Sequence, residues 1–224
     1  MAVTFSDIRI WPTGNRIANA LILGALSRRK TLVVSDGLIQ ALSADQLAAV
    51  VAHESAHVSR HHLRVRTLYL AAPLLAVTAA VCVNPALSEL VMAWASESSH
   101  WQIWVPWVAV WLAYVVFVIG WLSRQLETEA DLVACGTIDS LNRYRLNGDV
   151  ADDFSHALLA LAADSGQDAF RATWLHPSLS SRVLFLREVG TNPALADRFL
   201  ETLREKKRWI LLAWLAVFFV LLWI

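Results

Sequence analysis

The chain has 224 residues, 57% of them hydrophobic and only 17% charged, and its formal net charge is zero. An ordinary soluble domain has about a quarter of its residues charged, so this composition is atypical of one. A chain so rich in apolar residues is not intrinsically disordered. With 19 basic and 19 acidic side chains it has no net charge to attract nucleic acid. Two cysteines, Cys82 and Cys135, exclude a disulfide framework beyond one bridge, and we expect both to be free thiols.

The first forty residues predict β-structure. Residues 5–10 roughly alternate apolar and polar side chains, and residues 20–26 are a short apolar run. A polar turn at 27–30 then leads into a further apolar segment, residues 31–35. This order predicts a small N-terminal β hairpin or sheet.

A helix is expected to follow the hairpin. Ser43 with Gln46 three residues later is a capping box, which predicts a helix that begins at Ala44. The helical pattern continues through His62, and we expect it to run straight into the first long apolar segment. Further helices are predicted at residues 124–135 and 153–163, and from the Asn192-Pro193 step onward.

Three segments without charged residues predict membrane helices: residues 67–83, 101–122 and 209–224. A helix needs about 20 residues to cross the hydrocarbon core of a bilayer. The central segment has 22 residues, whereas the other two have 17 and 16 and are near the lower limit. We expect the first two to span the bilayer and the last to be a C-terminal anchor. The alternative for each is a buried core helix.

The charges that flank these segments predict an orientation and a division into four parts. Residues 84–100 carry two glutamates and no basic residue, whereas basic residues lie at the other ends of the spans. The positive-inside rule therefore places residues 1–66 and 123–208 in the cytoplasm and makes 84–100 a short outer loop. The expected parts are 1–66 (hairpin and first helix), 67–122 (two spans), 123–208 (a second cytoplasmic half) and 209–224 (anchor).

A metal-binding pattern lies inside the helix that begins at Ala44. His53 and His57 are four residues apart, so both imidazoles lie on one face of the helix and can bind one metal ion. Glu54 follows the first histidine and can reach the open position of the metal, where a carboxylate acts as general base. By itself an HExxH pattern arises by chance roughly once in a hundred such sequences, so a polar helix face remains the alternative.

The other histidines of this region are expected to have lesser roles. His61 continues the four-residue spacing, but each such step drifts around the helix, so a fourth ligand is not expected and only a supporting role is left open. We expect His62 to be exposed or at the membrane interface.

Zinc requires a third protein ligand, and an acidic segment seventy residues later offers candidates. Glu127 and Asp131 are four residues apart, so one helix face presents a ligand and a carboxylate that can orient a histidine. Glu129 lies about 200° around the helix from Glu127, and we expect it on another face. The alternative is a solvated acidic face. A further segment, Leu-His-Pro-Ser with His176, is followed by Arg182; alone, both are typical of surface residues.

The motifs taken in this order resemble the HtpX-type membrane metallopeptidases. The resemblance covers about residues 17–190 and rests on HESAH, two apolar segments, SRQLETEAD and HPSLSSR. Relatives of that family are gluzincins and include the CAAX prenyl proteases and the mitochondrial inner-membrane stress protease. The resemblance implies a mainly α membrane protein with a zincin-like metal helix. HtpX proteins have two spans before the metal helix, whereas this chain has none there and has an apolar run at 209–224.

The resemblance also implies roles for individual residues. One zinc ion would be bound by His53, His57 and Glu127, with Glu54 as general base. Asp131 would support a ligand, and His176 and Arg182 would assist the tetrahedral intermediate or position the substrate.

The resulting prediction is a zinc metalloendopeptidase that cleaves membrane or membrane-proximal proteins. It would lie in the bacterial inner membrane with its active site on the cytoplasmic side, and its partners would be protein or peptide substrates and lipid, with no nucleic acid. The strand at residues 32–35 is expected to offer an edge with which an extended substrate could pair. The alternatives are a prenyl-protein processing peptidase and a catalytically silent membrane scaffold.

Overall fold

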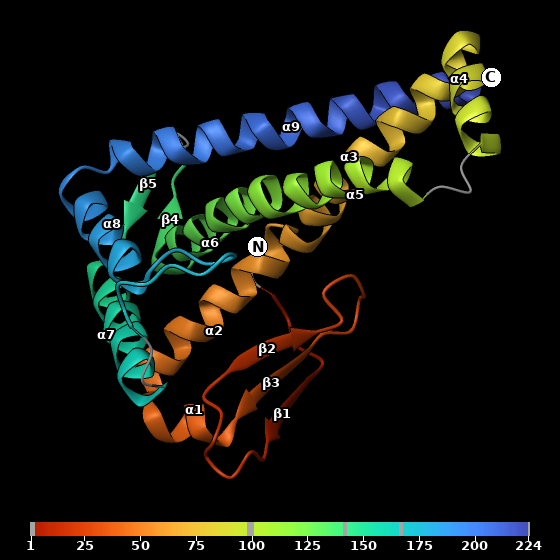
Figure 1. The fold of residues 1–224 in the computed structure, drawn as a ribbon. Coiled ribbons are helices and arrows are strands. Elements are labelled where there is room, and N and C mark those ends of the chain that lie inside the picture. The colour runs from red at the N-terminus through yellow and green to blue at the C-terminus, as the bar shows by residue number, and fades with distance from the viewer. Residues whose placement is uncertain (1–2, 98–100, 141–142, 166–167, 224) are drawn as a thin grey trace. The chain divides into compact units, whose positions relative to one another are not determined.

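The computed structural model describes residues 3–97, 101–140, 143–165 and 168–223 (Figure 1). Over these residues the chain is mostly helical, as expected, with one three-stranded and one two-stranded sheet. It forms two compact units, one made of residues 1–63 and 123–202 and the other of residues 64–122 and 203–224. The first unit contains both sheets and every candidate site residue named above, and the second contains most of the apolar segments.

The N-terminal sheet contains the predicted hairpin and one additional pairing. Strands β2 (Ala20–Leu23) and β3 (Thr31–Ser35) are antiparallel, and β1 (Asp7–Trp11) pairs in parallel with β3. The strand order is therefore β1-β3-β2. The expectation that residues 32–35 form an edge is wrong, because β1 occupies that side of β3; the edges of the sheet are β1 and β2.

Two helices with side-chain caps follow the sheet. Ser35 caps helix α1 (Asp36–Ala41), and the capping box of Ser43 and Gln46 begins helix α2 (Ala44–Ser59) at the predicted residue. In Figure 1 both helices lie beside the three-stranded sheet, and α2 packs against β2. The sheet therefore supports the helix that carries the HExxH pattern.

The helix that carries the HExxH pattern does not run into the first apolar segment, contrary to the expectation. It ends at Ser59 with Arg60 as its C-cap, and His61 has a left-handed backbone with φ of 57°. A new helix, α3 (His62–Val83), begins at the next residue. A left-handed residue after the C-cap is a common helix ending, although glycine usually fills that position.

The remaining elements of the first unit build one hydrophobic core with the sheet and α2. Buried residues of α7 and α8 pack in this core, among them Phe154, Val183 and Leu186. The elements are α6 (Gly120–Cys135), β4 (Gly136–Ile138), β5 (Tyr144–Leu146), α7 (Gly148–Ser165), α8 (Leu179–Thr191) and the start of α9 (Ala194–Trp223). The core fixes α2 against α7, and α7 against α8.

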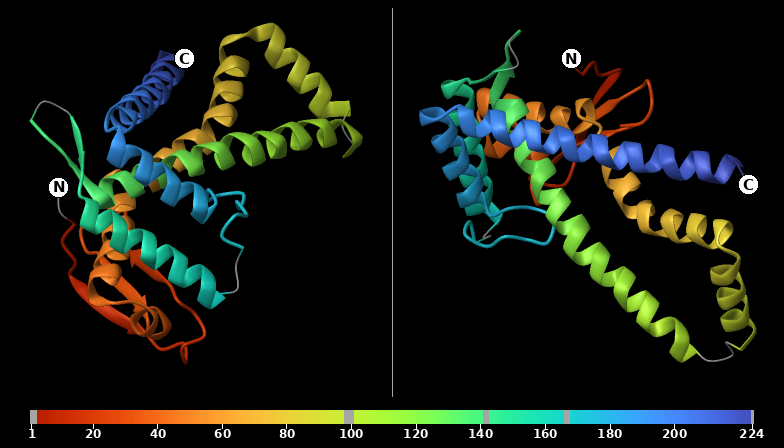
Figure 2. Two further views of the ribbon diagram at one scale, coloured as in Figure 1. Left: turned by 90° about the vertical axis from the view of Figure 1, so that its left-hand side faces the viewer. Right: turned by 90° about the horizontal axis from the view of Figure 1, so that it is seen from above.

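The second unit contains the helices that the apolar segments form. After α3 come α4 (Pro85–Glu97), α5 (Trp101–Tyr114) and a π-helical segment, η1 (Val115–Ile119), which continues into α6. The expectation of a loop at 84–100 is wrong for residues 85–97, which form a helix with proline at its first position. Residues 98–100 lie outside the described part. Figure 2 shows α4 leaving α3 at an angle.

In the described part of the chain, two helices are long and apolar enough to cross a membrane: His62–Val83 and Val105–Cys135. Only a small part of the most apolar 18-residue stretch of each is buried, whereas the core helix of a soluble protein would be mostly buried. Residues 209–223 of the last apolar run form the end of α9, and the role of this run as an anchor stays a prediction.

Candidate metal centre

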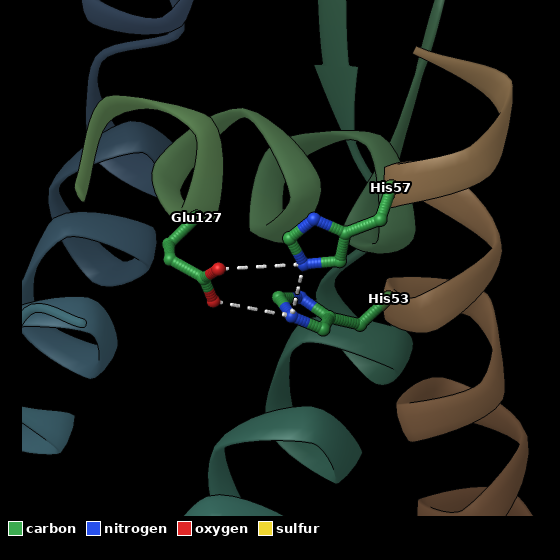
Figure 3. Close-up of side chains that lie close together, drawn as sticks. All are labelled: His53, His57 and Glu127. Atoms are coloured by element: carbon green, nitrogen blue, oxygen red, sulfur yellow. Dashed lines mark hydrogen bonds and ion pairs between the residues drawn. The ribbon is translucent and has the colours of Figure 1, made fainter. Parts of the chain in front are cut away.

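Three side chains from two helices converge on one point (Figure 3). His53 and His57 lie one turn apart on α2, and their Nε2 atoms are 3.2 Å apart. Glu127 of α6 faces both: its carboxylate oxygens lie 3.6 Å from Nε2 of His53 and 3.5 Å from Nε2 of His57. Ligands at 2.0–2.1 Å from a tetrahedral zinc ion are about 3.3 Å from one another, so this spacing fits one zinc ion.

His53 is held from behind by a buried charged pair. Its Nδ1 lies 2.9 Å from Oδ1 of Asp131, which stands one helical turn after Glu127 on α6. Arg182 of α8 donates two hydrogen bonds to the same carboxylate, of 2.8 Å from Nε and 2.6 Å from a terminal nitrogen. Phe154 of α7 stacks on the His53 ring at 5.4 Å between centroids. Asp131 thus lies behind the histidine, as the helical spacing suggested, and Arg182 faces Asp131.

His57 has a different arrangement behind it, which sequence reasoning missed. Its Nδ1 lies 2.8 Å from Nδ1 of His62, and Nε2 of His62 lies 2.9 Å from a carboxylate oxygen of Glu129. His62 is 1% exposed and Glu129 is 6% exposed. The expectation that His62 is exposed or interfacial is therefore wrong. Glu129 faces His62, whereas Glu127 faces His53 and His57, in line with the expectation of another helix face, but Glu129 is buried there. The helix break at His61 turns the chain back so that His62 reaches His57.

The electrostatics around His53 favour a positive charge on its imidazole. Burial by itself would lower the pKa of the His53 imidazole, but the carboxylates of Asp131 and Glu127 raise it to about 9. These two carboxylates therefore favour the charged form of His53 when no other cation is bound. Two imidazole nitrogens and a carboxylate are donors that zinc prefers, so the residues present fit a zinc ion.

Glu54 and His176 both lie near the three converging side chains. Glu54 is partly buried, whereas His176 is exposed. Burial raises the pKa of the Glu54 carboxyl. The nearby His53 lowers this pKa, and the negative charge of Glu127 raises it further. His176 is on the loop before α8, and its Nδ1 lies 3.1 Å from Oε2 of Glu127, while about half of its side chain, 54%, is exposed. The backbone of His176 makes two hydrogen bonds with Thr173, which hold the loop in a turn.

Comparison with known proteins relates the chain to one family of peptidases. Residues 11–189 match the profile of peptidase family M48. Proteins described as "Protease HtpX homolog" are similar to the chain. The one from Neisseria meningitidis serogroup B (strain ATCC BAA-335 / MC58) is 25% identical over 182 residues, which is 76% of this chain and 62% of that protein.

Two further proteins with the same description, from other bacteria, show the same level of similarity. The one from Chlorobium phaeobacteroides (strain BS1) is 26% identical over 190 residues, 79% of this chain and 61% of that protein. The one from Herminiimonas arsenicoxydans is 26% identical over 188 residues, which is 76% of this chain and 62% of that protein. The chain thus covers less than two thirds of the length of these relatives. No solved structure shows significant similarity to it.

Proposed function

The chain belongs to peptidase family M48, and on this premise we propose that it is a zinc-dependent endopeptidase that cleaves membrane or membrane-proximal proteins. The observation that supports this best is the convergence of two histidines and one glutamate, with ligand atoms spaced as around one zinc ion. His53, His57 and Glu127 would hold the ion. When bound, zinc supplies a Lewis acid that lowers the pKa of water and polarises a peptide carbonyl.

The side chains of the protein would carry the proton transfers. Glu54 follows His53 on the same helix, and its pKa is raised in the direction of neutral pH. A pKa closer to the working pH suits a group that must both accept and donate a proton. We assign it as the base that takes a proton from the attacking water and passes it to the leaving amine. His176 is half exposed beside Glu127 and would donate a hydrogen bond to the developing oxyanion.

The position of the candidate site along the chain supports a membrane-proximal substrate. His57 lies ten residues before the first apolar segment and Glu127 lies five residues after the second. Following the positive-inside rule, we place the active site on the cytoplasmic side of a bacterial inner membrane, with residues 209–224 as a further anchor in lipid.

The test compares wild type with Glu54→Gln in detergent-solubilised full-length chain. Because Glu54 is assigned as the base and not as a ligand, Glu54→Gln should keep about one zinc per chain and lose nearly all cleavage of a labelled unfolded protein. Zinc is measured by elemental analysis and cleavage by gel and mass spectrometry.

Other outcomes would contradict the proposal in different ways. Unchanged turnover in Glu54→Gln would refute the assigned mechanism. Zinc without any cleavage by wild type would favour a catalytically silent scaffold, and cleavage confined to a prenylated C-terminal peptide would favour a prenyl-protein processing enzyme.

A further inference from the structure

We propose that His62 and Glu129 form a buried hydrogen-bonded relay that fixes the tautomer and the ring orientation of His57, and so positions it for zinc. The inference rests on the proposed zinc site. It concerns two side chains that contact no substrate, and they are therefore positioning residues.

The contacts form a chain of two hydrogen bonds from three elements. His57 is on α2, His62 is the first residue of α3, and Glu129 is on α6. The nitrogen–nitrogen distance of 2.8 Å and the nitrogen–oxygen distance of 2.9 Å are both within the range of well-formed hydrogen bonds. The His57 and His62 rings meet nearly perpendicularly, at 85°. With His62 and Glu129 buried, water does not compete for these bonds.

The chemistry of the three groups sets the direction of both bonds. The Glu129 carboxylate has no proton to donate, so it accepts the Nε2 proton of His62. A neutral His62 then has a lone pair on Nδ1, which accepts the Nδ1 proton of His57. His57 is left with a lone pair on Nε2, the atom that faces His53 and Glu127. The relay therefore selects the tautomer that can bind the metal ion.

The helix break is what makes this relay possible. In an unbroken α-helix, positions 57 and 62 would point about 140° apart around the axis and could not meet. The left-handed backbone of His61 ends α2 and turns the chain, so that His62 returns to the face of His57. The two histidines proposed as ligands are thus oriented by different groups. Nδ1 of His53 faces the Asp131 carboxylate, whereas Nδ1 of His57 faces the His62 imidazole, which in turn contacts the Glu129 carboxylate.

Variants of His62 test the relay, and a variant of the adjacent His61 serves as the control. In His62→Leu the acceptor for His57 is lost, whereas in His62→Gln the amide keeps one acceptor and one donor. His61→Asn is the control, because asparagine tolerates the left-handed conformation and His61 is exposed. Glu129→Leu removes the far end of the relay.

Zinc affinity is measured by competition with a chelator in the full-length chain, together with the visible spectrum of the cobalt-substituted protein. We expect the zinc dissociation constant to rise about 10–100-fold in His62→Leu and Glu129→Leu, with altered cobalt bands. His62→Gln should recover most of the affinity, and His61→Asn should match wild type. Should His62→Leu fail to fold, His62→Asn replaces it, because its amide is too short to bridge both partners.

The outcomes separate this relay from the zinc site on which it rests. If wild type binds zinc and cleaves, but His62→Leu binds zinc as tightly as His61→Asn, the relay is overturned and the proposed function stands. Equal losses in His62→Gln and His62→Leu at unchanged thermal stability would also overturn it. If wild type binds no zinc, the proposed function fails first, and the relay fails with it.

Discussion

Arg182 and Asp131 form a buried ion pair in which each charge depends on the other. Arg182 is 9% exposed and Asp131 is 2% exposed, and two hydrogen bonds join them. The guanidinium also lies over the Phe154 ring at 5.4 Å. A buried pair of this kind contributes little compared with an apolar replacement, but removal of one partner leaves an uncompensated charge.

The first prediction concerns this pair. Arg182→Met should lower the free energy of unfolding by about 3–5 kcal/mol, because the Asp131 carboxylate stays buried without its partner. The double variant Arg182→Met/Asp131→Asn should be more stable than Arg182→Met alone, because the unpaired charge is removed with it. Denaturant unfolding of the solubilised chain measures both. A double variant less stable than the single one would show that the ion pair is not the source of the loss.

Residue-scale sequence reasoning found the groups that share one helix turn and missed those that do not. His53 with His57, and Glu127 with Asp131, are each four residues apart, and helical periodicity alone predicts that each pair shares a face. His62 and Glu129 are 67 residues apart in sequence, and no local pattern predicts their contact. The sequence does show a histidine at position 62, but its role becomes visible only when the helix is known to end before it.

At the scale of elements, the end of α2 has a strained backbone conformation at His61, and this conformation brings His62 to His57. His61 has a positive φ, which costs an ordinary side chain about 1–2 kcal/mol relative to a right-handed conformation, and which glycine adopts freely. Arg60 and His61 donate backbone hydrogen bonds to the carbonyls of Ala56 and Val58, so the helix is closed there.

The second prediction follows from this conformation. His61→Gly should raise the free energy of unfolding by up to about 1 kcal/mol and leave zinc affinity unchanged, because the break is kept and its strain is relieved. His61→Val should lower stability, since a β-branched side chain tolerates positive φ poorly. Thermal unfolding with zinc titration measures both variants. A loss of zinc in His61→Gly would mean that the His61 side chain itself supports the site.

Elements with a local signal were predictable, whereas pairings between distant segments were not. The β2–β3 hairpin follows from a polar turn between two apolar runs, and the start of α2 follows from its capping box. The parallel pairing of β1 with β3 joins strands separated by β2 and leaves no trace in the sequence. Helix α4 lies in the segment expected to be a loop, because the absence of basic charge indicates the side of the membrane and carries no information on secondary structure.

At the scale of the whole molecule, apolar side chains are distributed differently in the two units. The first unit has one buried hydrophobic core, although some of its large apolar side chains, among them Ile8, Ile10 and Phe170, are exposed. In the second unit, described residues of α3, α5, η1 and α9 expose large apolar side chains, among them Leu74, Val77, Val110, Phe117 and Leu215. Water would not stabilise such surfaces, but hydrocarbon would, which agrees with the two candidate membrane helices.

The last prediction concerns the orientation of these helices. Arg60, Arg64 and Arg66 lie at the start of the first candidate span, and Arg124 follows the apolar part of the second, whereas α4 between them carries only acidic charges. The positive-inside rule therefore predicts that α4 lies outside and the candidate metal centre inside. In a background with Cys82 and Cys135 replaced by alanine, an impermeant maleimide added to spheroplasts should label Glu89→Cys.

The matched probe for the other side is Ser140→Cys, which lies in the exposed turn after β4. It should react only after the membrane is permeabilised, because the turn belongs to the unit that holds the metal centre. The reverse labelling pattern would place the metal centre outside and invert the orientation. Labelling of both probes in intact spheroplasts would mean that His62–Val83 and Val105–Cys135 do not cross the bilayer as a pair, since two crossings must separate α4 from both flanking segments.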